Sequence, residues 1–217
     1  MFVLKKMTPD PIVVPSKTSV SEAMEIMKKN DFRRLPIVDA GKLVGIVTDR
    51  DLREVAPSPA TTLSVYELKY LLDKIKLSEI MKKKVITISD AATIEEAALV
   101  MYNHKISGLV VVNEERSVVG IITATDILKC FVDVMGLPNG LIRLTVVADD
   151  HVGLLSDITE VFKALSINIT SMVNYYLPEG KVEMVIRADI HDVTELSNRL
   201  AAAGYPISHA VKIGNHE

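Results

Sequence analysis

Two threonine–aspartate pairs are the residues of this chain whose spacing most clearly indicates chemistry. Thr48 precedes Asp51 and Thr123 precedes Asp126 by three residues, in each case directly after an apolar run. At the start of a helix, a hydroxyl and a carboxylate at this spacing form a capping box that satisfies free backbone amides. The same groups can instead hydrogen-bond the oxygens of a bound ligand, together with helix N-terminal amides. Spacing alone favours neither alternative.

Each pair ends one of two copies of a longer unit. Gly45–Leu52 returns as Gly120–Ile127, and the upstream Leu35–Val38 returns as Leu109–Val112. The period of about 75 residues is too long for a solenoid of small repeats. Each copy is also too small to bury its apolar face alone, so we expect the two copies to pack on each other.

The pattern within each copy predicts strand, helix, strand, strand and helix, with the last helix beginning at the threonine. Ile12–Val14 is the first predicted strand, and a capping box at Ser19–Glu22 opens the helix. The two following strands form a hairpin that turns at Ala40–Gly41. In the second copy, Val85–Ile88 is the strand and Thr93–Glu96 the capping box.

The composition between the copies predicts a tether. Ala56–Thr62 is rich in proline, serine and threonine, and a third capping box at Ser64–Glu67 starts another helix. A cluster of turn residues at 136–140 marks a domain boundary. The predicted organisation is a first copy (1–56), a linker with a helix (57–76), a second copy (77–135), a short linker (136–140) and a last domain (141–217).

The last domain has a different predicted order of strands and helices. We predict, in order, a strand at 141–147, a helix at 153–165, strands at 167–177 and 182–188, a helix at 194–203 and a strand at 207–211. The order βαββαβ in about 75 residues is the ferredoxin-like, split-βαβ arrangement. The predicted fold class of the whole chain is therefore α+β.

Both parts resemble known families. The doubled unit, ending in Gly-Ile-Val-Thr-x-x-Asp and Gly-Ile-Ile-Thr-x-x-Asp, resembles the CBS (cystathionine-β-synthase) domain, which occurs as tandem pairs of βαββα units called Bateman modules. The last domain resembles the ACT domain. Asp150–Leu155 matches the Asp-x-x-Gly-x-Leu of that family, and Ser166–Ile169 is close to its usual Gly-Ile-Asn-Ile.

The CBS resemblance implies an adenine nucleotide (AMP, ADP or ATP) as a regulatory ligand, rather than an obligatory cofactor, in clefts between the paired units. The residues that would hold it are Asp51 and Asp126 on the ribose hydroxyls, Thr48 and Thr123 on phosphate oxygens, and Ile12 and Ile86 beside the adenine. The alternative remains that the threonines and aspartates only cap their helices.

The two copies differ where phosphates would lie. The first copy carries Arg33 and Arg34, whereas the second has the uncharged Ser107 and Gly108. Because guanidinium forks suit phosphate oxygens, we predict that the site of higher affinity includes Arg33 or Arg34. The alternative is a solvated surface pair. Since residues of both copies can meet at each site, the sequence leaves open which cleft the arginines serve.

The ACT resemblance implies a small metabolite, often an amino acid, at an interface between subunits. The turn from Asp150 to Gly153 and Leu154 lies where a helix N-terminus could bind a carboxylate, and Asn168 could hydrogen-bond the other end of the ligand. Alternatively, Asp150 is only a helix cap, Gly153 only a close-packing residue, and the domain only a dimerisation sheet. Ser166 departs from the usual glycine of the family.

The residue patterns argue against catalysis. The five histidines lie in unrelated contexts, and neither a His-Glu-x-x-His metal motif nor a Walker-type glycine loop occurs. We therefore expect a non-enzymatic regulator without a metal, which responds to a ligand and controls a partner metabolic enzyme. The alternative is a constitutive dimerisation scaffold with no physiological nucleotide.

Composition sets further expectations. The formal charge of −3 comes from intermixed signs, which argues against nucleic acid as a partner. Charges interrupt every long apolar stretch, which argues against a membrane. Cys130 is the single cysteine and reads as a packing residue, so we expect a cytoplasmic protein. We also expect a homodimer, because Met24, Met27 and Met101 lie on helix faces that could be exposed, unless they are buried within one chain.

Overall fold

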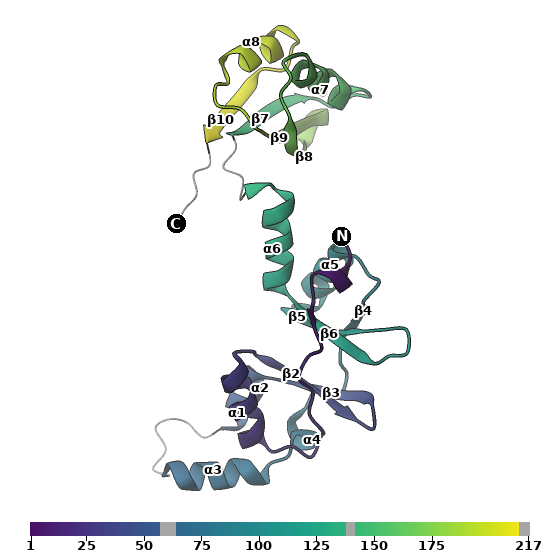
Figure 1. The fold of residues 1–217 in the computed structure, drawn as a ribbon, viewed down its shortest axis with the longest axis vertical. Coiled ribbons are helices and arrows are strands. Elements are labelled where there is room, and N and C mark those ends of the chain that lie inside the picture. Colours follow the sequence, from purple (N-terminus) through teal and green to yellow (C-terminus); the bar gives the residue numbers. More distant parts are fainter. Residues whose placement is uncertain (57–63, 138–141, 213–217) are drawn as a thin grey trace. The chain divides into compact units, whose positions relative to one another are not determined.

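A computed structural model describes residues 1–56, 64–137 and 142–212 of the chain. It divides into two compact units, Met1–Ile127 and Leu128–Glu217, which are drawn in sequence colours in Figure 1. The division falls within helix α6 (Ala124–Val134), before the predicted boundary at 136–140. The predicted linker after Ala56, most of the turn cluster, and the first residue of the predicted strand at 141–147 lie outside the described residues.

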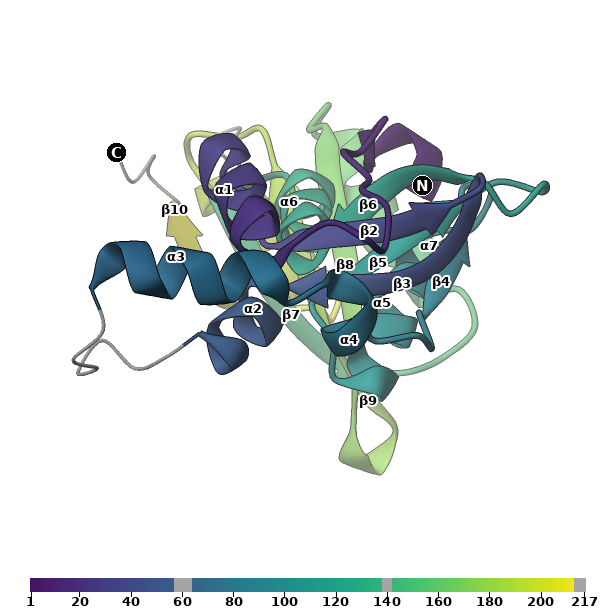
Figure 2. The ribbon, with the colours of Figure 1, turned by 90° about the horizontal axis from the view of Figure 1, so that it is seen from below.

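The first unit contains the two repeats. Its elements are the short 3-10 helix η1 (Val3–Lys5), β1 (Thr8–Pro9), α1 (Val20–Asn30), β2 (Arg34–Asp39), β3 (Lys42–Thr48), α2 (Asp49–Val55), α3 (Val65–Lys74), α4 (Leu77–Ile80), β4 (Thr87–Ser89), α5 (Ile94–His104), β5 (Gly108–Val112), β6 (Val118–Thr123) and the start of α6. Each copy has the predicted helix, hairpin and second helix. Helix α3 lies against α1 (Figure 2), and Lys69 of α3 pairs with Glu25 of α1 at 2.9 Å.

The first strand of each copy is shorter than predicted. Of Ile12–Val14, only Val14 makes a ladder contact, a single parallel bridge to Ile37, and β4 leaves Ile86 outside the strand. Pro11 and Pro15 bracket the first of these segments. Val14 makes both of its ladder bonds to β2, and the next amide on that side, that of Ser16, donates to the Asp39 side chain at 2.9 Å, which ends the ladder.

The first residues of each copy pack on the other copy. Strand β1 pairs with β6 of the second repeat, so that sheet has the order β1-β6-β5-β4. Conversely, Lys82 forms an antiparallel bridge with Ile46 of β3, and Leu77 is fully buried in the core of the first repeat. Sequence ranges and folded halves therefore do not coincide at these two segments.

Local signals for turns and caps are largely confirmed. The boxes at Ser64–Glu67 and Thr93–Glu96 form with both reciprocal hydrogen bonds. At Ser19, the hydroxyl accepts from the Glu22 amide at 3.2 Å, which is the first half of a box. Ala40 and Gly41 have φ of 49° and 77°, the left-handed pair expected of a two-residue hairpin turn.

The methionines that were expected to expose an apolar face are in the core. Met27 is 4% exposed and Met101 5%, while Met24 is partly buried against the same core as Met27. The prediction of a methionine-lined docking face was therefore wrong. Helix amphipathicity places these side chains inward, because each copy buries its apolar stripe within the chain.

The second unit has the predicted order βαββαβ. Its elements are the end of α6, β7 (Ile142–Asp149), α7 (Leu154–Ala164), β8 (Ile169–Leu177), the 3-10 turn η3 (Pro178–Gly180), β9 (Lys181–Ala188), α8 (Thr194–Ala202) and β10 (Ile207–Lys212). The antiparallel sheet has the order β10-β7-β9-β8, and α7 and α8 cover one of its faces (Figure 1). Phe162, Met184 and Leu196 are among the buried residues between sheet and helices.

Candidate functional site

A cleft of about 530 Å³ in the first unit is lined by residues of both repeats. It is bounded by Arg33, Arg34, Ile46, Thr48, Asp49, Arg50, Lys82, Lys84, Val85, Ile86, Lys105, Ile106, Ser107 and Gly108. Five predicted ligand-binding residues therefore meet here: Arg33, Arg34, Thr48, Ile86 and Ser107. The cleft does not include Asp51, Ile12, Thr123 or Asp126, and the Ile12 side chain is 42% exposed.

Arg34 reaches across from one repeat to the other. It begins β2 opposite Thr48, and its Nη2 donates a hydrogen bond to Ser107 Oγ. A Cβ on Gly108 would lie only 2.6 Å from Arg34 Nε, so the guanidinium passes over a position that has no side chain. Burial, and to a lesser extent the charge of Arg33, lowers the pKa of Arg34.

This geometry corrects the expected contrast between two clefts. Arg33 and Arg34 were predicted to distinguish one site, and Ser107 and Gly108 the other. The structure places all four on one cleft. The physical reason is the packing of the repeats, which brings equivalent positions at the starts of β2 and β5 together.

The walls of the cleft combine charge with an apolar surface. Six cationic side chains line it, namely Arg33, Arg34, Arg50, Lys82, Lys84 and Lys105. Asp49 is the one lining carboxylate among the described residues, and it pairs with Arg53 at 2.8 Å. Ile46, Val85, Ile86 and Ile106 supply the apolar part. Such a lining suits a ligand with a flat apolar portion and several negative charges.

Asp51 lies next to the cleft and is fully engaged by the chain. Its Oδ2 accepts from the Thr48 amide at 2.7 Å and the Thr48 hydroxyl at 2.6 Å, and its amide donates back to that hydroxyl at 3.3 Å. Its Oδ1 lies 2.8 Å from Lys82 Nζ. Burial alone would raise the pKa of Asp51, but hydrogen bonds from Lys82 and Thr48 outweigh it and hold the pKa below its usual value.

Asp126 forms the same box at the start of α6. Its Oδ2 accepts from the Thr123 amide at 2.8 Å and the hydroxyl at 2.7 Å, and its amide donates to that hydroxyl at 3.4 Å. The capping alternative therefore describes both pairs as they stand in this structure. Asp126 is half-exposed, and no basic side chain of the described residues pairs with it.

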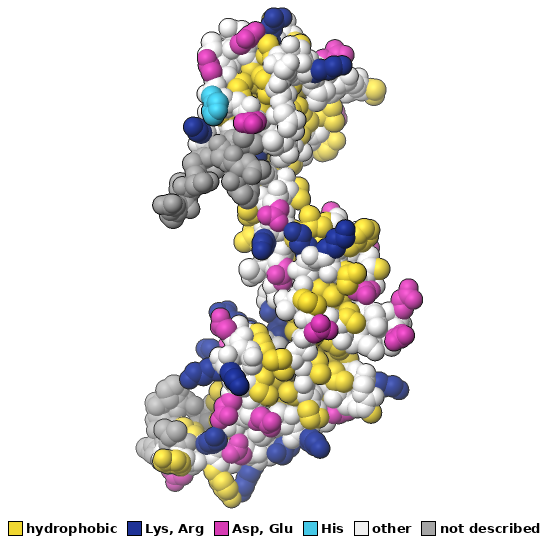
Figure 3. Space-filling view, viewed as in Figure 1, with side chains coloured by type: hydrophobic (Ala, Val, Ile, Leu, Met, Phe, Trp, Pro, Cys, Tyr) yellow, Lys and Arg dark blue, Asp and Glu magenta, His cyan; other side chains and the backbone are white. Residues whose placement is uncertain are grey.

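Sequence reasoning missed four of the six cations: Arg50, Lys82, Lys84 and Lys105. The sequence shows three consecutive lysines at 82–84, but nearby acidic residues balance their charge. Basic and acidic side chains are likewise interspersed over the first unit in Figure 3. Only the bridge between Lys82 and Ile46 brings the start of this run beside Asp51. No local pattern indicates that pairing.

In the second unit, the predicted effector residues do not converge on a described cavity. Gly153 caps α7 with φ of 100°, and Leu154 is 4% exposed within the core. Asp150 and Asn168 are both exposed. The proposed effector role of these four residues stays a prediction.

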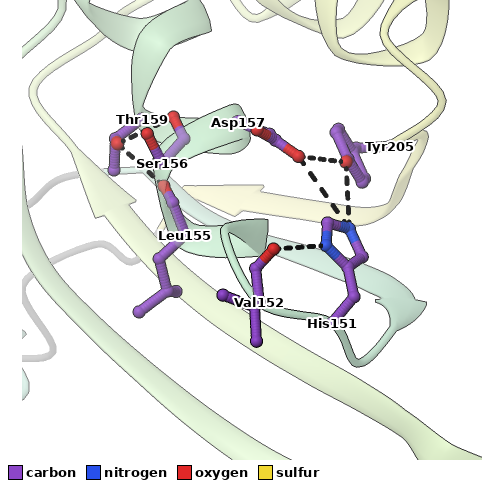
Figure 4. Close-up of polar contacts among 7 residues, drawn as sticks. All are labelled: His151, Val152, Leu155, Ser156, Asp157, Thr159 and Tyr205. Carbon is purple, nitrogen blue, oxygen red and sulfur yellow. Dashed lines mark hydrogen bonds and ion pairs between the residues drawn. The ribbon is translucent and has the colours of Figure 1, made fainter.

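A polar cluster lies beside that turn (Figure 4). The Tyr205 hydroxyl donates to Asp157 Oδ2 at 2.9 Å and lies 3.4 Å from His151 Nε2. The hydrogen bond to Asp157 is the main cause that raises the pKa of Tyr205. Asp157 and Tyr205 also border a groove of about 580 Å³ between α7 and α8, together with Arg199.

Comparison with known proteins identifies the class. The CBS-domain family model matches residues 3–58 and 77–133, just over half of the chain. The chain therefore belongs to the CBS-domain family and carries the CBS domain twice. The family match ends before the second unit's sheet begins.

Two kinds of relative share the CBS region. A CBS domain-containing protein of Dictyostelium discoideum is 34% identical over 119 residues, which are 54% of this chain and 82% of that protein. Inosine-5'-monophosphate dehydrogenase of Aquifex aeolicus is 34% identical over 122 residues, 55% of this chain but only 22% of the enzyme. The chain thus spans about a fifth of that enzyme.

Three solved structures resemble the CBS pair. The CBS pair of protein MJ0100 in complex with 5'-methylthioadenosine and S-adenosylmethionine is 34% identical, with a TM-score of 0.51 over 61% of this chain and 97% of that one. A putative acetoin utilisation protein (AcuB) of Vibrio cholerae is 31% identical, with a TM-score of 0.51 over 64% and 96%. CBSX2 in complex with AMP is 28% identical, with a TM-score of 0.50 over 61% and 97%.

Two further observations concern membranes and metals. Within the described ranges, every helix is too short or too polar to cross a bilayer. The same residues include no group of three or more His, Cys, Asp or Glu side chains placed to hold a metal ion.

Proposed function

We propose that this chain is a non-catalytic regulator whose CBS pair binds an adenine nucleotide in the cleft between the repeats. The observation that carries the proposal is the lining of that cleft, where six cationic side chains and one carboxylate adjoin an apolar wall. The adenine would lie against Val85 and Ile86, and the phosphates against Arg33 and Arg34. The ligands named for the MJ0100 and CBSX2 structures support an adenosine-containing molecule.

The excess of positive charge favours a nucleotide with several phosphates. One phosphate cannot satisfy six cations, whereas the tri- and diphosphate chains of ATP and ADP carry more negative oxygens for the arginine forks. The expected order of affinity is ATP, then ADP, then AMP.

Ribose binding at Asp51 requires Lys82 to move. Both oxygens of Asp51 are engaged, and Oδ1 is held by a lysine whose side chain is 64% exposed. Because the Lys82 side chain is largely exposed, solvent screens its attraction to Asp51, so a phosphate that attracts Lys82 can free Oδ1 for a ribose hydroxyl. Phosphate and ribose recognition would then be coupled through one side chain.

The regulatory step follows from the two-repeat lining. A nucleotide that bridges both repeats shifts their arrangement if it binds one arrangement more tightly than another. We propose that a partner metabolic enzyme senses this shift. The likeness to the Vibrio cholerae AcuB structure supports acetoin utilisation as the context.

The second unit is proposed to be an ACT domain that binds an amino acid or another small metabolite near Asp150–Leu154 and Asn168. Its βαββαβ order and its Asp-x-x-Gly-x-Leu turn support this assignment. We also propose a cytoplasmic homodimer. The exposed Leu128, Phe131 and Val134, spaced three residues apart along α6, support the dimer in place of the buried methionines.

Calorimetry tests the nucleotide proposal. The full chain is titrated with AMP, ADP, ATP, NAD and S-adenosylmethionine, and the experiment is repeated with Asp51→Ala and Asp126→Ala. We expect ATP to bind most tightly and Asp51→Ala to weaken it more than Asp126→Ala, because Asp51 adjoins the cleft. Absence of heat for every nucleotide would favour the constitutive scaffold instead.

A further inference from the structure

The sheet of the second unit carries a row of polar side chains on the face that α7 and α8 do not cover. Directly paired residues of neighbouring strands share a face. Arg187 of β9 is paired with Arg143 of β7 on one side and with Ser171 of β8 on the other. Leu144 and Ile186, the next residues along, belong to the core beneath the helices. Arg143, Arg187 and Ser171 therefore stand side by side on the opposite face.

Arg187 is buried without a full set of partners. Its side chain is 3% exposed, and its Nε has no hydrogen-bond partner. Ser171 Oγ, directly beside it, is also buried and without a partner. A buried guanidinium whose Nε–H has no acceptor is costly, and native structures rarely keep such a donor without a reason.

The strands of the sheet supply no counter-ion to the two arginines within the described residues. No ion pair joins Arg143 or Arg187 to a carboxylate of β7, β8 or β9. Glu183 lies on the same face of β9 but four positions from Arg187, about 14 Å at ~3.4 Å per residue. Asp189, two residues beyond Arg187, forms no ion pair with it. Like charges directly opposite in a ladder are destabilising.

The surroundings hold the arginines in place while leaving one side open. Arg143 Nη1 donates to Thr145 Oγ1 at 2.7 Å, which orients its guanidinium. A Cβ on Gly136 would lie 3.5 Å from Arg187 Cδ, so Gly136 packs near the aliphatic stem of Arg187. Arg143 is only half-buried, so solvent reaches the row from its side.

We propose that Arg143 and Arg187, with Ser171 as a further donor, form a binding site for a small oxyanion on the face of this sheet opposite α7 and α8. The ligand class is a molecule that presents a carboxylate or a phosphate group, since both match the planar donor fork of arginine. The site is separate from the turn at Asp150–Leu154 and does not depend on the nucleotide cleft of the first unit.

The test observes Arg187 directly in the full chain. The protein carries Arg33→Ala and Arg34→Ala to weaken anion binding at the other cleft, and its arginines are labelled with ¹⁵N. Acetate, phosphate and chloride are titrated at equal ionic strength while the arginine Nε–Hε signals are recorded, and Arg187→Lys identifies the signal of Arg187. We expect a saturable shift of that signal with acetate, phosphate or both, and none with chloride. Equal shifts with all three anions, or none with any, would overturn the proposal.

Thermal unfolding supplies the second readout. In the same Arg33→Ala, Arg34→Ala background, Arg187→Met removes a buried charge whose Nε lacks a partner. Without oxyanion the unfolding midpoint of this variant should not fall, and the rise caused by acetate or phosphate should disappear. Arg199→Met, at an exposed arginine of α8, is the matched control and should keep that rise. A variant Arg187→Met that keeps the full rise would contradict the site. If Arg187→Met does not fold, Ser171→Ala takes its place and should reduce the rise.

Discussion

The two threonine–aspartate boxes of the first unit have the same local structure and different surroundings. The carboxylate accepts at 2.7 and 2.6 Å in the Thr48–Asp51 box and at 2.8 and 2.7 Å in the Thr123–Asp126 box. Only Asp51 also binds a lysine, Lys82, and only Asp51 is buried. Four consecutive residues therefore determine the hydrogen bonds of each box, while a residue far away in the sequence determines the charge beside its carboxylate.

The two boxes have different neighbours because a different residue of the other copy pairs beside each box. Lys82 pairs with Ile46 of the first repeat, and Thr8 pairs with Ile121, the equivalent residue of the second. Thr8 thus occupies the place of Lys82 in the second half of the pair. The difference in charge comes from the first residues of each copy, where the two copies differ in sequence.

The largest effect is expected from removing Arg34, whose equivalent in the second copy is Gly108. Arg34→Ala should weaken ATP binding by about 10- to 100-fold, the range expected when hydrogen bonds between charged groups worth ~1.5–3 kcal/mol are lost. Calorimetry of the full chain measures it. Lys29→Ala removes an exposed cation of α1 outside the cleft and should leave the affinity unchanged. Equal losses of affinity in both variants would mean that Arg34 acts only through the net charge of the protein and not by contact with the ligand.

The second prediction tests whether the two boxes are equivalent. Thr48→Ala and Thr123→Ala should each lower the free energy of unfolding by about 1 kcal/mol, the usual contribution of an N-cap. Urea unfolding of both variants measures the two losses under one set of conditions. A loss at one position only would mean that surroundings, rather than local hydrogen bonds, determine the value of the cap.

The third prediction concerns acid. Because the pKa of Asp51 is lowered on folding, the unfolded chain binds its proton more readily. The stabilisation is therefore complete above the unfolded value of about 4 and is lost as the pH falls through the lower folded value. Lys82→Thr, which copies the second half, should reduce the gain in stability between pH 3 and pH 7 by less than about 1 kcal/mol, since Lys82 is largely exposed. Urea unfolding at the two pH values measures this gain. If the gain in the free energy of unfolding is the same in Lys82→Thr, Lys82 does not contribute to the lowered pKa of Asp51.

The smallest expected effect comes from the reciprocal change. Thr8→Lys places a lysine where Asp126 has no basic partner, and should add a few tenths of a kcal/mol at low salt. The gain should disappear at high salt because exposed pairs are screened. Unfolding at two salt concentrations measures it, with Thr8→Met as the uncharged control. A gain that survives high salt would point to packing by the longer side chain.

Sequence reasoning predicted features whose causes are local. The hairpin at Ala40–Gly41 and the box at Thr93–Glu96 each depend on residues that are neighbours in sequence. The predictions from sequence were wrong where the neighbours of a residue in space come from distant parts of the chain. Met27 and Met101 looked available on helix faces, but both are buried. The apolar run at Ile12–Val14 looked sufficient for a strand, but the ladder stops at Val14 because the Ser16 amide donates to the Asp39 side chain.

By itself, the sequence determined the duplication, the two boxes, the βαββαβ order of the last domain and the presence of arginines in one copy only. These follow from periodicity and from hydrogen bonds that span three or four residues. Tertiary structure alone decided that Arg34 meets Ser107, that Lys82 binds Asp51, and that Arg187 is buried beside Arg143. Each of these contacts depends on strand register and on the packing of segments far apart in the chain, so no local pattern of residue types predicts them.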